Sequence, residues 1–270
     1  MERETDAGAR GGGRTDAREG LGPKIAVLDL WKAFSGRGVL RGINLQVSPG
    51  ESLVIVGQSG AGKSVLLKHL IGLVAPDRGH VIIDGEDLTN SDPARCLEIR
   101  RKFGMSFQEG ALFDSMNVFG NIAFPLRRHT AMSEDEIAAR VRECLALVHL
   151  EGVETKATSE LSGGMRRRVG FARAIAHQPE ILLFDEPNTG LDPITSAVID
   201  SVIAEMRESL DVTMVTITHD MKSAFRIADR IAMLRNGEII AEAAPEAFRS
   251  LPDPYIQKFL AGEPLEEEVA

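Results

Sequence analysis

The feature that most constrains this chain is a glycine-rich segment between an apolar run at 53–56 and a helix-like run at 65–71. It has the phosphate-binding pattern G-x-x-x-x-G-K-[ST] and consists of Gly57, Gln58, Ser59, Gly60, Ala61, Gly62, Lys63 and Ser64. Glycines let successive backbone N–H groups turn inward towards phosphate oxygens, and the following helix N-terminus adds partial positive charge. We expect Lys63 to reach the β- and γ-phosphates and the Ser64 hydroxyl to bind Mg²⁺. The strand before and the helix after argue against a solvated lysine in an ordinary turn.

Length and composition limit the remaining possibilities. A chain of 270 residues can bury one substantial α/β core with an inserted subdomain. No apolar run approaches the roughly 20 residues of a membrane span, so we expect any membrane role to be peripheral. The net charge of -9 argues against nucleic-acid binding by the whole surface, although it leaves a local basic groove possible.

The two ends and the two cysteines carry weaker signals. Residues 1–24 are rich in glycine and charge and lack the apolar core of a signal peptide, which predicts a disordered leader. Residues 261–270 form an acidic tail that we expect to be mobile or bound to a partner. Cys96 and Cys144 have no metal-ligand spacing and are interpreted as ordinary thiols of a reducing compartment.

Strand patterns surround the glycine-rich segment. Runs at 25–34, 39–47 and 81–85 predict an antiparallel sheet beside the nucleotide site. At the end of the first run, Phe34 could stack on an adenine ring, or it could be an ordinary core or edge phenylalanine. Asn236-Gly237, between two β-branched or apolar runs, predicts a two-residue hairpin.

The pattern becomes helical between Phe103 and Leu161. Ser133 and Glu136 form a capping box, and apolar residues then recur at helical spacing, at Ile137, Val141, Cys144, Leu145 and Val148. This predicts a helical insertion in the α/β core.

Another helix is expected to begin at Ser162, which can cap it. Gly163 and Gly164 would leave the first backbone N–H groups uncovered, as an anion site requires, although this pattern taken alone more often marks a capped helix after a flexible turn. The charge run at 166–168 is interpreted as a solvated or ion-paired face.

Two acidic residues follow the buried run at 180–184. Asp185 is placed to hold Mg²⁺ and Glu186 to polarise water; the alternative is that they only end a strand or cap a helix. His219 ends a second β-branched run at 212–218. A lone histidine at a strand end is usually structural, but this one leaves the same sheet edge as Lys63 and Asp185, where open α/β sheets bind ligands.

Together these motifs resemble the ATP-binding subunit of an ATP-binding cassette (ABC) transporter over 25–260. Gln108 matches the glutamine that senses Mg²⁺ and the membrane partner, 161–165 matches the LSGGQ-type signature with Met165 in place of glutamine, and Asp192 matches the dimer-contact loop. The resemblance implies an α/β P-loop NTPase core of RecA-like type, with an antiparallel β-subdomain and an inserted α-helical subdomain at about 109–165.

The resemblance also implies roles for individual residues. Catalysis would depend on Glu186, His219, Lys63 and Gln108, and the metal would be held by Ser64, Gln108 and Asp185. Nucleotide contacts would come from Phe34, Gly57, Gln58, Ser59, Gly60, Ala61, Gly62, Lys63, Ser64, Val65, Ser162, Gly163, Gly164 and Asp192. A second copy of the chain would complete two head-to-tail ATP sites.

The segments 107–119, 123–127 and 252–254 are similar to the ATPase of the Mla (MCE-type) phospholipid transport system. This similarity implies a peripheral ATPase on the cytoplasmic face of a bacterial inner membrane, beneath multi-span permease subunits. An MCE-domain lipid-binding protein and a STAS-domain protein are possible further partners. The alternatives are an ABC transporter ATPase for another substrate, a non-transport ABC ATPase of DNA repair or iron–sulfur assembly, and a regulatory nucleotide-binding module without catalysis.

Overall fold

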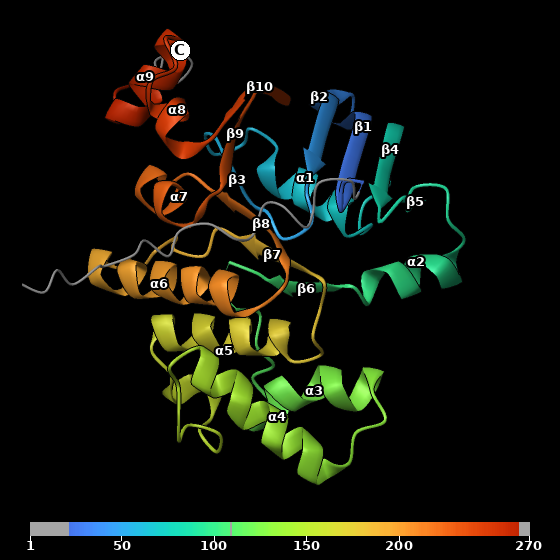
Figure 1. The fold of residues 1–270 in the computed structure, drawn as a ribbon, viewed down its shortest axis with the longest axis vertical. Coiled ribbons are helices and arrows are strands. Elements are labelled where there is room, and N and C mark those ends of the chain that lie inside the picture. The colour runs from blue at the N-terminus through green and yellow to red at the C-terminus, as the bar shows by residue number, and fades with distance from the viewer. Residues whose placement is uncertain (1–21, 109, 265–270) are drawn as a thin grey trace, which may run out of the picture.

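The computed structural model describes residues 22–108 and 110–264 (Figure 1). Most of the predicted leader and the last six residues of the predicted acidic tail lie outside these ranges. Two sheets form the body of the described chain. A four-stranded antiparallel sheet has the order β2-β1-β4-β5, and a six-stranded sheet has the order β10-β9-β3-β8-β7-β6. The second sheet is parallel from β6 to β9, and β10 joins its edge antiparallel to β9.

The bounds of the elements are as follows. The strands are β1 Ile25–Phe34, β2 Arg37–Val47, β3 Ser52–Val56, β4 Arg78–Ile83, β5 Glu86–Asp87, β6 Phe103–Ser106, β7 Ile181–Asp185, β8 Thr213–Thr218, β9 Arg230–Arg235 and β10 Glu238–Ala243. The helices are α1 Lys63–Leu70, α2 Pro93–Arg100, α3 Val118–His129, α4 Glu134–Leu147, η1 Thr158–Glu160, α5 Gly163–Ile175, α6 Pro193–Ser209, α7 Met221–Ile227, α8 Pro245–Arg249 and α9 Pro254–Ala261.

The parallel sheet is covered on both faces, which explains why its central strands are continuous apolar runs. Successive side chains of β3 point to opposite faces. Leu53 and Ile55 pack with α1 and the antiparallel sheet in one core, whereas Val54 and Val56 join the core beneath α5, α6 and α7. The glycine-rich loop that follows β3 is therefore anchored from two cores.

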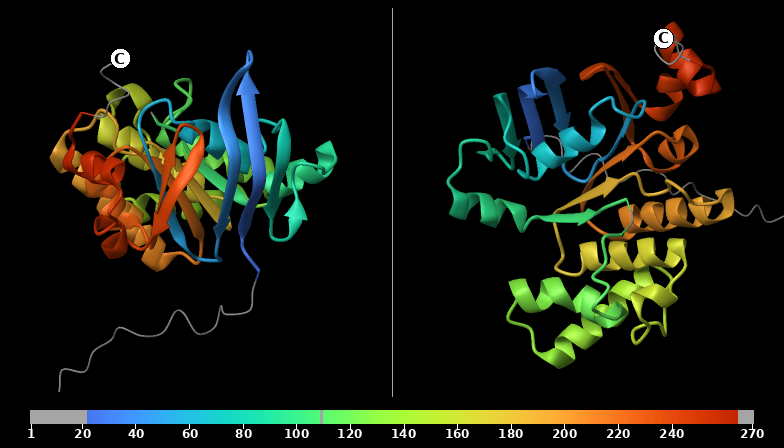
Figure 2. Two further views of the ribbon diagram at one scale, coloured as in Figure 1. Left: turned by 90° about the horizontal axis from the view of Figure 1, so that it is seen from above. Right: turned by 180° about the vertical axis from the view of Figure 1, so that it is seen from behind.

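Helices α3 and α4 form a subdomain on the far side of α5. Figures 1 and 2 show them at the opposite end of the molecule from α8 and α9. The predicted capping box of α4 is confirmed, since the Ser133 hydroxyl accepts from the Glu136 N–H and the Glu136 carboxylate accepts from the Ser133 N–H. The five apolar positions predicted for this helix are all buried. The pattern alone thus placed the buried face of the insertion correctly.

The hairpin at Asn236-Gly237 is also confirmed, with φ of 49° and 82° between β9 and β10. The strand predicted at 81–85 is shifted, because β4 begins at Arg78 and ends at Ile83. Helices α2, α8 and α9 lie in segments where no helix is predicted from the sequence. Within the described ranges, no helix is long and apolar enough to cross a membrane.

Candidate active site

The glycine-rich loop joins β3 to α1 and has the tight backbone that the pattern predicts. Gly57 has a φ of 155°, and a Cβ there would come within 2.2 Å of the Leu234 carbonyl oxygen. Gly62 has a φ of 108° and closes against the backbone of Val39, whose carbonyl oxygen would lie 3.1 Å from a Cβ. Both positions therefore require glycine. The loop is held at a close approach to β2 and β9.

The Lys63 side chain folds back into this loop. Lys63 is 6% exposed, and its ammonium donates to the carbonyl oxygens of Gly57 at 2.8 Å and Gln58 at 3.0 Å. It also lies 3.3 Å from Oε1 of Glu186. A buried positive charge is thus fixed between the loop and a carboxylate at the end of β7.

Ser64 and Asp185 bring oxygen atoms together beside the loop. The Ser64 hydroxyl donates to Oδ1 of Asp185 at 3.2 Å. Ser64 and Gln108 both line one cavity at this edge of the sheet. Burial raises the pKa of the Asp185 carboxyl, and this effect outweighs the hydrogen bond from Ser64, which lowers it. Hydroxyl, carboxylate and amide oxygens suit Mg²⁺ when phosphates and water complete its shell. Among the described residues there is no cluster of three His, Cys, Asp or Glu that could hold a metal without such help.

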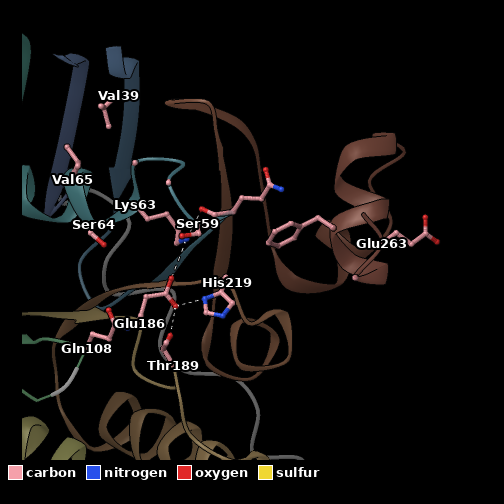
Figure 3. A pocket seen from close by; sticks show the side chains of 15 residues that line it. Val39, Ser59, Lys63, Ser64, Val65, Gln108, Glu186, Thr189, His219 and Glu263 are labelled. Atoms are coloured by element: carbon pink, nitrogen blue, oxygen red, sulfur yellow. Dashed lines mark hydrogen bonds and ion pairs between the residues drawn. The ribbon is translucent and has the colours of Figure 1, made fainter. Parts of the chain in front are cut away.

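Glu186 stands where β7 emerges from the sheet, and three side chains surround its carboxylate (Figure 3). Its Oε2 accepts from the Thr189 hydroxyl at 3.1 Å and lies 2.8 Å from Nδ1 of His219, while Oε1 faces Lys63. His219 comes from the end of β8, the strand next to β7. A carboxylate fixed in this way can orient a water molecule and accept its proton. Thr189 is not among the site residues predicted from the sequence.

These side chains border a cavity of about 670 Å³ at the carboxyl ends of the parallel strands. Its lining residues come from β2, from the loop and α1, from the segment after β6, from the Glu186 and His219 segments, and from α9 and the residues after it. They are Val39, Gln58, Ser59, Gly60, Gly62, Lys63, Ser64, Val65, Gln108, Glu186, Thr189, His219, Phe259, Gly262 and Glu263. Most of the predicted loop residues, all except Gly57 and Ala61, are thus brought together with Gln108, Glu186 and His219 at one edge of the sheet, as expected for the ends of parallel strands.

Phe34 is not among the residues that border this cavity. It is 45% exposed at the end of β1, with the Lys32 ammonium 5.3 Å from its ring centroid. Val39, the third residue of β2, borders the cavity on this side instead. In this structure, Phe34 is an exposed aromatic residue outside the cavity.

Helix α9 reaches the cavity although it lies almost 200 residues beyond the loop. The Tyr255 hydroxyl donates to Oε1 of Gln58 at 3.1 Å, and the Arg235 guanidinium lies 3.9 Å from the centre of the Tyr255 ring. Phe259, one helical turn later, lines the cavity itself. No local pattern in the sequence indicates this contact.

The segment at 162–164 lies away from the cavity. Ser162 caps α5 by accepting from the Met165 N–H at 3.3 Å, as predicted. Asp192 caps α6, accepting from the N–H groups of Ile194 and Thr195. A Cβ on Gly164 would lie 2.5 Å from the Thr195 side chain, so the two helix starts adjoin. None of these predicted nucleotide contacts borders the described cavity.

The prediction that 166–168 form a solvated or ion-paired face holds for Arg166, which is exposed, but is wrong for Arg167, which is only 8% exposed. All three arginines bind backbone carbonyls: Arg166 that of Leu161, Arg167 those of the Glu186 segment, and Arg168 those at the end of α4. The physical reason is that α5 lies between the segment after β7 and the end of α4, and both present backbone carbonyls to its arginines. The guanidinium groups satisfy acceptors that would otherwise lack partners.

Comparison with known proteins gives concordant matches. The family model described as "ABC transporter" matches residues 40–189. The intermembrane phospholipid transport system ATP-binding protein MlaF of Escherichia coli is 41% identical, over 88% of each chain. The probable ribonucleotide transport ATP-binding protein mkl of Mycobacterium tuberculosis is 42% identical, over 90% of this chain and 67% of the relative.

Solved structures match as well. CbiO1 from Clostridium perfringens, part of the ABC transporter complex cbiONQ, superposes with a TM-score of 0.79 at 28% identity, over 88% of this chain and 95% of that one. The ATP-binding cassette MJ0796, solved as a dimer bound to ADP and Pi, gives a TM-score of 0.75 at 33% identity, over 82% of this chain and 98% of that one.

Proposed function

This chain belongs to the ABC transporter family of ATP-binding proteins, and on that basis we propose that it hydrolyses ATP to drive phospholipid transport through a membrane permease. The observation that carries the proposal is the juxtaposition of Lys63, Glu186 and His219 around one cavity at the strand ends. The lipid part is supported by the similarity to MlaF, an ATP-binding protein of intermembrane phospholipid transport, which matches over most of both chains. The relative mkl, named for ribonucleotide transport, supports a second candidate, an ABC transporter ATPase with another substrate.

The chemistry follows from the positions of these groups. The triphosphate would lie on the N–H groups of the loop, where Lys63 offsets the charge that develops on the transferred phosphoryl group. Mg²⁺, held by Ser64, Asp185 and Gln108, would neutralise phosphate oxygens when bound. Glu186 would orient the attacking water and accept its proton. His219 would hold the carboxylate on one side and contact the γ-phosphate on the other.

The signature segment belongs to a second site. Because Ser162, Gly163 and Gly164 lie away from this chain's own cavity, their uncovered helix start would meet the γ-phosphate bound by a second copy, with Asp192 beside it. A two-fold pair would then contain two such composite sites. The dimeric cassettes among the solved relatives support this arrangement.

The domain division and the membrane setting are proposals of the same kind. An ABC ATPase domain at 25–260, with its helical part at about 109–165, would lie on the cytoplasmic face of the membrane beneath multi-span permease subunits. We also propose an MCE-domain lipid-binding protein and a STAS-domain protein as further partners, which the sequence resemblance to the Mla system implies. The segment after Gln108 would transmit the opening and closing of the ATPase dimer to the permease.

Substituting Glu186→Gln tests the hydrolytic part. The amide keeps the shape of the side chain but cannot accept a proton, so we expect hydrolysis to fall by about 10²- to 10⁴-fold while ATP binding persists. Phosphate release and binding of a fluorescent ATP analogue would be measured on the purified full chain, with Glu205→Gln, an exposed change on α6, as control. Hydrolysis at the wild-type rate in the Glu186 variant would exclude the proposed role.

Isolation from native membranes tests the transport part. A tagged chain should bring down a multi-span membrane protein, and the lipids retained with that complex should include phospholipids. Recovery of a DNA-repair or iron–sulfur assembly complex instead would contradict transport. The second candidate would be favoured if the recovered permease complex contained no bound lipid and if its rate of ATP hydrolysis rose when another solute was added.

A further inference from the structure

Helix α5 carries four arginines that each donate to backbone carbonyls of a different segment. Arg166 binds the segment before the helix, Arg168 binds the end of α4, and Arg173 binds the carbonyls of Gly110 and Ala111. Arg167 alone among them reaches the segment that follows β7. Figure 1 shows α5 lying between the layer that contains the six-stranded sheet and helices α3 and α4.

The Arg167 side chain is buried and meets three carbonyls of one short segment. The residue is 8% exposed. Its two terminal nitrogens donate to the carbonyl oxygens of Glu186, at 3.2 Å, and of Pro187 and Thr189. A planar guanidinium offers several donors in a fixed fork, so it can hold three acceptors in one geometry; a lysine ammonium lacks this fork.

The segment that Arg167 holds has a demanding conformation. Glu186 has a φ of 49°, a left-handed value that non-glycine residues seldom adopt without support from their surroundings. From this same segment, the side chains of Glu186 and Thr189 meet in a hydrogen bond. The backbone that Arg167 fixes is therefore the backbone that sets the direction of the Glu186 carboxylate.

We propose that Arg167 is a positioning residue that holds the Glu186 carboxylate in its working orientation and ties it to helix α5. This inference rests on the proposed function, in which the start of α5 contacts the nucleotide of a second copy. A small shift of α5 when that second site fills would then reach Glu186 through the guanidinium. Arg167 would thus couple hydrolysis in one site to nucleotide binding in the other.

Substitutions at Arg167 and Arg168 form a matched test. Both side chains lie on the same helix and bind carbonyls, but the acceptors of Arg168 belong to Val148 and His149, remote from the cavity. The full-length variants Arg167→Lys, Arg167→Gln, Arg168→Lys and Arg168→Gln would be compared for kcat, KM and the Hill coefficient of ATP hydrolysis. Binding of a fluorescent ATP analogue and the melting temperature would be measured in parallel.

We expect kcat to fall about 10- to 100-fold in both Arg167 variants, since a small misplacement of a catalytic group has effects of this size. KM and analogue binding should stay within about twofold, because the phosphate loop is untouched, and the Hill coefficient should move towards one. If Arg167→Gln does not fold, the test rests on Arg167→Lys, which keeps the charge and the apolar stem, and on its kcat and Hill coefficient compared with those of Arg168→Lys.

The proposal is overturned if Arg167→Lys keeps the kcat and Hill coefficient of Arg168→Lys, or if its defect lies in ATP affinity alone. Failure of the proposed function would look different. In that case the wild-type chain itself would hydrolyse no ATP, and Glu186→Gln would change nothing. Wild-type hydrolysis with equal rates in the Arg167 and Arg168 variants would remove only the positioning role.

Discussion

Nδ1 of His219 lies 2.8 Å from Oε2 of Glu186, although the two residues are 33 positions apart in the chain. The parallel pairing of β7 with β8 creates this contact, because it brings the carboxyl ends of both strands to one sheet edge. The contact between the imidazole and the carboxylate is therefore set by the register of these two strands.

We expect His219→Ala to lower ATP hydrolysis by about tenfold or more while ATP binding changes little. The substitution removes a group that contacts the Glu186 carboxylate, together with the proposed contact to the γ-phosphate. Steady-state phosphate release would be measured beside His149→Ala, which breaks another exposed His–Glu pair of 2.8 Å, with Glu205. An equal loss in both variants would mean that the His219 contact has no special role.

Ser64→Ala should raise the Mg²⁺ concentration needed for half-maximal hydrolysis by about tenfold. The hydroxyl is one of the oxygen donors of the proposed metal site, and it also holds Asp185 in place. Titrating Mg²⁺ at constant ATP would measure this shift, with the exposed Ser201→Ala on α6 as control. An unchanged Mg²⁺ requirement would contradict the assignment of Ser64 as a ligand.

Asp200→Ala should destabilise the fold by about 2–4 kcal/mol. Asp200 is 2% exposed and accepts from Asn188 at 2.6 Å and from Ser223 at 3.1 Å, so its loss leaves two buried donors without this acceptor. The free energy of unfolding in urea would be compared with that of Glu205→Ala, an exposed change on the same helix that we expect to cost under about 0.5 kcal/mol. Similar midpoints for the two variants would refute the prediction.

Acidification should destabilise the chain partly through His69. Burial lowers the pKa of this imidazole below its ordinary value of 6.5, because the charged form is poorly solvated. The unfolded chain then binds more protons, so the neutral side chain stabilises the fold above pH 6.5, and this stability is lost as the pH falls through the lower folded value. His69→Leu should flatten the decline that begins as the pH falls below about 6.5, by up to about 1.4 kcal/mol per pH unit.

Urea unfolding of wild type and His69→Leu at several pH values would measure this effect. His80→Leu, a change of an exposed histidine paired with Asp87, serves as a comparison. If the free energy of unfolding fell equally with pH in wild type and in His69→Leu, the buried imidazole would not contribute to the acid sensitivity.

Local patterns predicted the parts of the site that depend on neighbouring residues. The phosphate loop is recognisable because some of its positions accept only glycine. At Gly57 and Gly62 the φ is positive and a Cβ would come too close to backbone atoms of other strands. The strand-end positions of Glu186 and His219 follow from two apolar runs and one rule about parallel sheets. The capping box at Ser133 needs only four consecutive residues.

The remaining features depend on contacts between distant segments, which such patterns do not contain. Arg167 looks like one member of a surface charge run until α5 is seen between two layers of carbonyls. Tyr255 contacts Gln58 across 197 positions, and no periodicity indicates this. Phe34 was expected at the nucleotide cavity, yet Val39 borders it on that side.

The position of α9 has a practical consequence for experiments on this protein. Gly262 and Glu263 line the nucleotide cavity, so a bulky label attached at Glu263 would stand at its border. Kinetic work should therefore keep this segment free of labels, and a label placed at Glu263 on purpose becomes a simple probe of access to the cavity.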